Sequence, residues 1–353
     1  MLNKQIVYAN TPTGEIDPSL NGNGTFKLQT SSIPAEIPAD KLLVRVHYLS
    51  LDPAMRQWLT ARRSYIAPVE LGAIMRGQAV AQVLLVGADL QSKYKKGDWV
   101  VGLTGWQENA VVGPKDVRKV VIPPGGRPTD AMSVLGTTGL TAYFGMNIAR
   151  PQPQDTVVVS GAAGATGMVA GQIAKIYGAK RVIGIAGGKD KCDFLKNELG
   201  FDGAVDYKDP EWLKQLKAAT PEYINVYFDN VGGNILDACL ARAAKDARFV
   251  ICGGISQYNT TKPRGPASFL NVIVSPPSFF SLLIMRKSWM ANTSRKSQRV
   301  TIKGFIVFDY IKSYPTALKD LASWLAQGKL RRKEYIIKGG LEAAPQGLVD
   351  LCK

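Results

Sequence analysis

The stretch VVVSGAAGATGMVAGQIA, residues 157–174, decides the fold of the larger part of this chain. A β-branched strand leads into small residues, and a helical segment begins near Thr166. Glycines at positions 161, 164 and 167 give the spacing G-x-x-G-x-x-G. Small residues let the backbone approach a pyrophosphate, which the positive end of the following helix attracts. The stretch predicts a dinucleotide-binding turn, and a purely structural strand-to-helix turn is the alternative interpretation.

Strand-like and helix-like segments alternate around this turn. Alternation with short connections implies parallel βαβ units in a doubly wound sheet. A helical region at 131–149, interrupted by a glycine turn, comes first. The predicted strands are 156–160, 181–187, 203–207, 224–229, 248–253 and 302–308, and the predicted helices include 168–178, 191–199 and about 313–327.

The first part of the chain has a different pattern, with short strands separated by turns. Residues 41–51 alternate between apolar and polar and then run apolar, and Gly97-Asp98 supplies a turn between two later strands. A compact β-barrel is the natural closure for such strands. We therefore expect an α/β protein with a barrel domain at 1–130, completed by 310–353, and a Rossmann domain at 131–309.

Composition restricts the class of protein without naming its partner. The 353 residues carry 44 Lys and Arg against 28 Asp and Glu, a formal charge of +16, which suits nucleic acid, an anionic membrane, a polyanionic cofactor or a solvated basic face. Four cysteines without a CxxC pair do not make a disulfide scaffold. No signal-peptide core and no apolar run of bilayer-spanning length is evident. We expect a cytoplasmic protein.

The end of the second predicted parallel strand favours NADP over NAD. An NAD enzyme usually places an acidic residue there to bind the ribose hydroxyl. The tip at 186–188 reads Ala-Gly-Gly, and Lys189 and Lys191 follow it. Two ammonium groups favour an additional phosphate, although Asp190 opposes them and lysines at a helix start also suit solvated surface.

The sequence excludes a Cys/His zinc site in the first domain. His47 is the only histidine, and no cysteine precedes Cys192. Because His47 lies in a predicted strand, we interpret it as a packed or surface side chain rather than a base. No Ser-His-Asp or Cys-His arrangement is evident. Without zinc, hydride addition to a conjugated double bond demands less of the protein than alcohol oxidation does.

Motifs along nearly the whole chain resemble those of one family, the prostaglandin reductase and alkenal double-bond reductase branch of the medium-chain dehydrogenase/reductase superfamily. The motifs are LSLDPAMR (49–56), GTTGLTAYFGM (136–146), SGAAGATG (160–167), YFDNVGG (227–233), ICGGISQYN (251–259) and KGFIVFDY (303–310). The resemblance implies a GroES-like barrel, a Rossmann domain and a substrate cleft between them. It also implies NADPH-dependent reduction of α,β-unsaturated aldehydes and ketones without zinc, by a homodimer.

The resemblance also assigns site residues. Tyr258 matches a tyrosine proposed to orient the substrate carbonyl or supply a proton, or else anchors its loop. Tyr65 resembles a substrate-pocket tyrosine, and Ala54 stands where the family often has tyrosine, so a substrate contact is lost or the pocket is wider. The residues that match the cofactor site are Gly164, Ala165 and Gly167 at the pyrophosphate, Lys191 at the 2′-phosphate, Tyr207 beside the adenosine, Asn230 beside the nicotinamide half (or a turn residue), Cys252, Gly253 and Ile255 after the fifth strand, and Phe305 and Val307 near the nicotinamide (or in the strand core).

Two further departures from the family and two rival functions remain open. Residues 262–300 form a longer connection, apolar and then basic, which suits a lid, a dimer contact, a membrane-surface patch or a packed loop. The chain ends at Lys353, before the family's Gly-Asn-Gly-Lys stretch, so we expect an altered barrel edge or a longer natural sequence. The rivals are an NADPH:quinone oxidoreductase and a nucleic-acid-binding protein that retains NADPH, although no nucleic-acid-binding module is recognisable. The natural substrate is not readable from the sequence.

Overall fold

The chain folds into two compact units. The computed structural model describes residues 2–61, 64–260, 262, 264–266 and 298–352. The first unit consists of Met1–Gly136, Tyr258–Lys262 and Glu334–Lys353, and the second consists of Thr137–Gln257 and Pro263–Lys333. The long connection expected at 262–300 lies mostly outside the described residues. Among the residues described, no helix has the length and apolar character needed to cross a bilayer.

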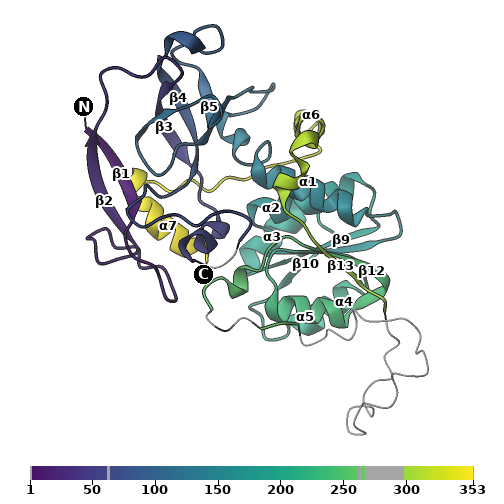
Figure 1. Ribbon diagram of the computed structural model, residues 1–353. Helices are drawn as coiled ribbons and strands as arrows, with labels where there is room; N and C mark the ends of the chain where they lie inside the picture. Colours follow the sequence, from purple (N-terminus) through teal and green to yellow (C-terminus); the bar gives the residue numbers. More distant parts are fainter. Residues whose placement is uncertain (1, 62–63, 261, 263, 267–297, 353) are drawn as a thin grey trace, which may run out of the picture. The chain divides into compact units, whose positions relative to one another are not determined.

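The first unit is built from antiparallel strands. A two-stranded sheet pairs β1 with β2, and a five-stranded sheet has the order β6-β3-β4-β5-β7. Their bounds are β1 (Leu2–Tyr8), β2 (Phe26–Ser32), β3 (Leu42–Leu49), β4 (Gln78–Val86), β5 (Trp99–Leu103), β6 (Asn109–Val112) and β7 (Val117–Lys119). Gly97, with φ of 90°, makes the predicted turn before β5. The C-terminal helix α7 (Ala344–Leu351) lies beside β1 in Figure 1 and adds Leu348 to the core around Phe26 and Trp106.

The second unit is a six-stranded parallel sheet with helical connections, as predicted. Its order is β10-β9-β8-β11-β12-β13, so the chain reverses direction across the sheet between β8 and β11 (Figure 1). Every residue of β8 is buried, which explains its unbroken apolar run. The strands are β8 (Thr156–Ser160), β9 (Arg181–Ala186), β10 (Gly203–Asp206), β11 (Ile224–Asp229), β12 (Ala243–Ile251) and β13 (Thr301–Gly304). The helices are α1 (Thr137–Ala149), α2 (Ala165–Ile176), α3 (Lys189–Asn197), α4 (Trp212–Ala219), α5 (Gly233–Ala241) and α6 (Tyr314–Ala326).

Some expected bounds differ from the structure. The strand predicted at 302–308 ends at Gly304, because a 3-10 helix begins at Val307 and the hydroxyl of Tyr314 donates to the Val307 carbonyl at 3.2 Å. β12 begins at Ala243 rather than residue 248, since Ala243 already pairs with β11 before a register shift. The tail rejoins the first unit at Glu334, later than the residue 310 expected for the domain boundary. α6 packs on α1, where the Tyr143 hydroxyl donates to the carboxylate of Asp320 at 2.6 Å, and therefore belongs with the parallel sheet.

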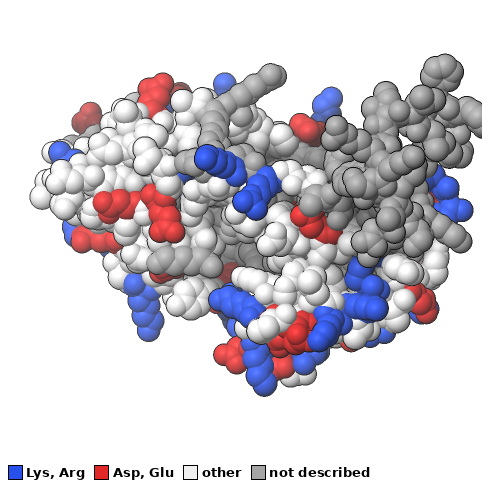
Figure 2. Space-filling model, turned by 90° about the horizontal axis from the view of Figure 1, so that it is seen from below, with Lys and Arg blue, Asp and Glu red and all other residues white. Residues whose placement is uncertain are grey.

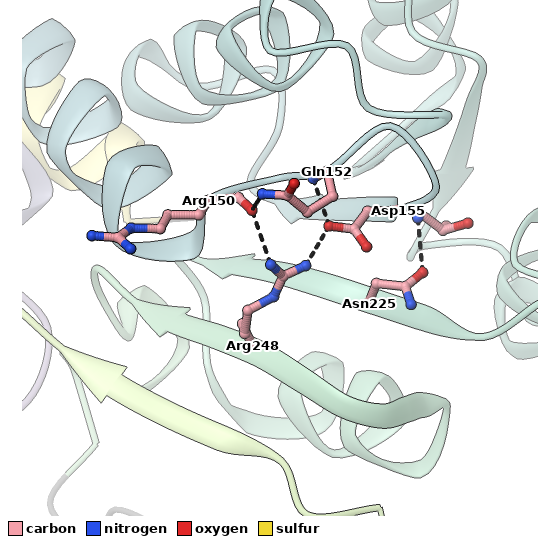
Figure 3. A network of polar contacts seen from close by, with 6 residues as sticks. Arg150, Gln152, Asp155, Asn225 and Arg248 are labelled. Carbon is pink, nitrogen blue, oxygen red and sulfur yellow. Dashed lines mark hydrogen bonds and ion pairs between the residues drawn. The ribbon is translucent and has the colours of Figure 1, made fainter.

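A polar network ties together the amino ends of three parallel strands (Figure 3). Arg248 in β12 forms an ion pair with Asp155, which precedes β8 and is 3% exposed. The Arg248 guanidinium also donates to the Arg150 carbonyl at 2.9 Å, and the Gln152 amide donates to the Asp155 carboxylate at 2.7 Å. The side-chain oxygen of Asn225 in β11 accepts a hydrogen bond from the backbone amide of Thr156, the first residue of β8, at 2.9 Å. These contacts hold β8, β11 and β12 together at the side of the sheet opposite the carboxyl ends of the strands.

Removing this buried carboxylate should destabilise the second unit. In Asp155→Ala the Arg248 guanidinium loses its charged partner, a change that costs about 3 kcal/mol in comparable buried pairs. We expect a clearly lower melting temperature by circular dichroism. Lys180→Ala is the matched control, because its ion pair with Glu222 is exposed, and it should melt close to the wild type. Equal melting temperatures for the two variants would contradict the role assigned to Asp155.

Candidate functional site

A buried carboxylate joins the carboxyl ends of β8 and β11, where the strand order reverses. Asp229 is 0% exposed. Its Oδ1 accepts hydrogen bonds from the hydroxyls of Ser160 and Tyr227, each at 2.8 Å, and from the backbone amides of Val231 and Gly232, each at 2.9 Å. Four donors at Oδ1 offset part of the cost of burying this carboxylate, while Oδ2 has no hydrogen-bond partner among the described residues. Burial, and then the charge of Asp229, raise the pKa of Tyr227 well above its ordinary value, so its hydroxyl remains a donor.

The same residues bind the neighbouring segments into one platform. The Asn230 side-chain amide donates to the Ser160 carbonyl at 2.7 Å, and the Asn230 backbone amide donates to the Ser160 hydroxyl at 2.9 Å. Beyond β12, the amides of Cys252 and Gly253 donate to the Asp229 carbonyl at 2.8 and 3.0 Å. The ends of β8, β11 and β12 therefore share one hydrogen-bonded surface. Three predicted site residues, Asn230, Cys252 and Gly253, lie on it.

The glycine loop has the geometry of a phosphate cradle. Gly161 has φ of +56°, and Gly164 is the N-cap of α2, with Ala165 as the first helical residue. A Cβ on Gly167 would lie 2.3 Å from the Gly161 carbonyl oxygen, so only glycine lets α2 pack this closely on the loop. The first-turn amides of a helix have no carbonyl of their own helix to bond and can receive an anion.

The tip of β9 is crowded by side chains from the loop after β10. A Cβ on Gly187 would lie 2.9 Å from the Tyr207 hydroxyl and 3.0 Å from Lys208 Cε. The Gly188 and Lys208 amides donate to Asp206 Oδ1 at 2.8 and 2.9 Å, and these two bonds lower the pKa of Asp206. The acidic residue nearest this tip is therefore occupied by backbone donors. Tyr207, predicted beside the adenosine, packs against this tip.

The two lysines that favoured NADP differ in their surroundings. Lys189 Nζ lies 2.7 Å from the Asp193 carboxylate and is thus committed to an ion pair one helical turn along α3. That contact raises the pKa of Lys189. Lys191, also in the first turn of α3, is exposed and forms no ion pair within the described part of the chain. Lys191 is the better candidate to bind a phosphate.

The residues expected on the substrate side belong to the first unit. Ala54 lies at the start of the 3-10 helix Pro53–Leu59, and its amide donates to the Asp52 side chain at 2.8 Å. Tyr65 is 53% exposed. Tyr258, which follows directly after the 3-10 turn Ile255–Gln257 of the second unit, is half-buried and begins the short segment that packs with the first unit. The Ile255 amide is anchored on the Asn230 carbonyl at 3.2 Å.

The remaining predicted residues lie in packed surroundings. Phe305 lies against α1, where its ring would be 3.1 Å from a Cβ on Gly145, and Val307 is buried. His47 is an exposed side chain in β3 with its ring 4.9 Å from that of Trp99, as the surface interpretation expected. Burial lowers the pKa of His47. Within the described residues, no group of three or more His, Cys, Asp or Glu is arranged to hold a metal ion.

Sequence reasoning missed the two residues at the centre of the platform. The motif YFDNVGG contains Asp229 but predicts no role for it, and the sequence pattern predicts Ser160 only as the last residue of a strand. A signal was present in the pattern, because Asp229 ends a strand whose neighbours Tyr227 and Phe228 are fully buried. A charged residue that continues a buried strand needs several donors close by.

Comparison with known proteins agrees with this arrangement. Residues 4–120 match the family described as the N-terminal domain of oxidoreductase, and residues 165–296 match the zinc-binding dehydrogenase family. The chain is 40% identical to a putative NADP-dependent oxidoreductase of Bacillus subtilis and 34% identical to a 2-alkenal reductase (NADP(+)-dependent) of Nicotiana tabacum, in each case over 99% of this chain and 94% of the relative. The crystal structure of CurA from Vibrio vulnificus in complex with NADPH superposes with a TM-score of 0.82 at 36% identity, over 99% of this chain and 95% of that chain.

The close packing of α2 on the glycine loop gives a direct test of the cradle. Gly167→Ala places a methyl group against the Gly161 carbonyl, a strain of about 1–3 kcal/mol. We expect dinucleotide binding, measured by calorimetry, to weaken by about 10-fold or more. Gly14→Ala is the control, because a Cβ there meets nothing within 4 Å. Unchanged affinity in Gly167→Ala would argue against a role for this loop in binding.

Proposed function

The chain belongs to the medium-chain dehydrogenase/reductase superfamily, in its alkenal double-bond reductase branch, and from this premise we propose that it uses NADPH to reduce the carbon–carbon double bond of α,β-unsaturated aldehydes or ketones. The observation that carries the cofactor part is the platform at the strand reversal. A glycine cradle lies on one side of it, and on the other lies the β9 tip, where the Asp206 carboxylate is bonded to backbone amides. Bound NADPH supplies the hydride that the β-carbon of the substrate accepts.

The residues present fit this cofactor. The Gly161 to Gly167 loop leaves room for the pyrophosphate. Lys191 is available for the 2′-phosphate because it is exposed and forms no ion pair with another described residue. Asn230 is held rigidly enough by Ser160 to orient a carboxamide. Cys252, Gly253 and Ile255 follow the same strand end, and Phe305 and Val307 are proposed to pack beside the nicotinamide.

On the substrate side the proposed chemistry needs one oriented hydroxyl. Tyr258 donates a hydrogen bond to the carbonyl oxygen and stabilises the negative charge that develops there as the enolate forms. The α-carbon then takes up one proton, which solvent water can supply. Tyr65 and Ala54 are proposed to line the substrate pocket, with Ala54 widening it. The donor set supports zinc-free chemistry, because the single histidine is an exposed strand residue.

A homodimer and a cytoplasmic location are part of the same proposal. None of the four cysteines forms a disulfide, which suits a reducing compartment.

The charge of +16 does not by itself support a nucleic-acid partner. On the face drawn in Figure 2, basic side chains lie among acidic ones rather than in one continuous patch. Several lysines form ion pairs, including Lys175 with Asp202 and Lys180 with Glu222.

Substrate competition tests the reaction. We expect the protein to oxidise NADPH with 2-alkenals and conjugated enones, and to leave saturated alcohols with NADP⁺ unchanged. The product should be the saturated aldehyde or ketone, identified by mass spectrometry. Reduction of quinones without reduction of enals would favour the quinone oxidoreductase alternative. Oxidation of alcohols without any enone reduction would contradict both.

Lys191 should set the preference for NADPH over NADH. Lys191→Ala removes a charged contact with the 2′-phosphate, worth about 1.5–3 kcal/mol. We expect Kd for NADPH to rise by about 10- to 100-fold in calorimetry while Kd for NADH stays unchanged. Lys189→Ala is the matched control, because Lys189 is paired with Asp193 and should affect neither value strongly. Equal losses for both cofactors would remove Lys191 from the phosphate site.

A further inference from the structure

We propose that Arg56 is a positioning residue for Tyr258 and acts through the side chain of Asn259. The inference rests on the proposed function, since it takes Tyr258 as the residue that touches the substrate carbonyl. Arg56 and the segment Tyr258–Lys262 belong to the same compact unit. A hydrogen bond joins the side chains of Arg56 and Asn259, which are 203 residues apart in the sequence.

The guanidinium of Arg56 is buried and donates to the oxygens of two backbone carbonyls and of one amide side chain. Its side chain is 4% exposed. One Nη donates to the Gly14 carbonyl at 2.6 Å and lies 3.5 Å from the Pro12 carbonyl, and Nε donates to Asn259 Oδ1 at 3.1 Å. A buried cation requires such oxygens, so each of these bonds is costly to lose. The requirement fixes the Asn259 amide with its oxygen toward Arg56.

The backbone that carries Arg56 is itself held in place. Arg56 lies in the 3-10 helix Pro53–Leu59, which begins with a proline and is capped by the Asp52 side chain through the Ala54 amide. The preceding residue, Met55, is 2% exposed and belongs to the core of the first unit. The backbone of Arg56 is therefore fixed by the cap and by the packing of Met55, and this fixes the position from which Nε donates.

Asn259 is half-buried among residues of the first unit. It lines a cavity of about 10 Å³, about the smallest space that admits one water, together with Glu15, Ile16, Val349 and Cys352. These residues come from the loop after β1 and from the end of α7, so Asn259 lies between segments distant in sequence. The hydrogen bond from Arg56 and this packing restrain residue 259, and with it the adjacent backbone of Tyr258.

A fixed backbone is what the proposed chemistry requires of Tyr258. Misplacing a catalytic hydroxyl by about 1 Å can cost up to about 100-fold in rate. A residue that only stabilises the unit would lower the melting temperature without a specific loss in kcat. A residue that acts through Tyr258 lowers kcat and has no further effect once the Tyr258 hydroxyl is absent.

The test is a double-mutant cycle on the full-length protein, with saturating NADPH and trans-2-hexenal as substrate. Asn259→Ala should lower kcat by about 10-fold, with Kd for NADPH close to wild type in protein that circular dichroism shows to be folded. Its melting temperature should also fall, because the buried Arg56 Nε loses an acceptor, and Asn259→Asp should restore it. Asn259→Asp keeps an acceptor for the Arg56 Nε and should restore most of kcat. The double variant Tyr258→Phe/Asn259→Ala should be no slower than Tyr258→Phe alone. Gln257→Ala is the neighbouring control, since its side chain bonds to Ser256 and to the Arg264 amide.

Losses from Tyr258→Phe and Asn259→Ala that multiply, or an unchanged kcat in Asn259→Ala, would overturn the positioning role and leave the reductase function intact. A wild-type protein that reduces no enal would instead overturn the proposed function. Hydrogen exchange measured by mass spectrometry separates the two cases, because it needs no turnover. Asn259→Ala should speed amide exchange in the peptide that contains residues 258–262, and equal exchange rates would contradict the inference directly.

Discussion

The candidate site depends on one buried carboxylate at the point where the strand order of the parallel sheet reverses. Asp229 ends β11, and its Oδ1 accepts four hydrogen bonds, from two hydroxyls and two backbone amides. A charge with 0% exposure persists only where such donors are fixed around it. The hydrogen bonds to this carboxylate therefore fix the positions of Ser160, Val231 and Gly232. Ser160 in turn orients Asn230 through two hydrogen bonds. Its field, after burial, further raises the pKa of Cys239 and keeps that thiol protonated.

The amino ends and the carboxyl ends of the parallel strands differ in their polar contacts. At the amino ends, the ion pair of Asp155 with Arg248 links β12 to the residue that precedes β8. At the carboxyl edge, the loops are short, rich in glycine and bonded mainly through backbone atoms, so a dinucleotide meets amides and small residues. The reductase chemistry then requires few side chains. The proposal assigns the choice of cofactor to Lys191 and contact with the substrate to Tyr258, which belongs to a segment of the first unit.

Local patterns predicted the sheet and the cofactor class well. The buried run at 156–160 and the glycine spacing after it have no good alternative to a parallel strand followed by a helix. The position of Asp229 was readable, but its role depends on Ser160, 69 residues earlier in the chain, and no local pattern reports that distance. The pairing of Arg56 with Asn259 was hidden for the same reason. The end of β13 at Gly304 was missed because the apolar run continues through Val307, which is buried in a 3-10 helix instead.

The account is tested most directly by calorimetric titration of NADPH into Asp229→Ala. The substitution removes Oδ1, the common acceptor of the Ser160, Tyr227, Val231 and Gly232 donors. Asp229→Asn is the matched control for charge, because it keeps an oxygen at Oδ1 and places its amide nitrogen at Oδ2, which has no hydrogen-bond partner among the described residues. If this side chain organises the ends of β8, β11 and β12, Kd for NADPH should rise by about 10-fold or more in Asp229→Ala that circular dichroism shows to be folded. An unchanged Kd in folded Asp229→Ala would contradict the central claim.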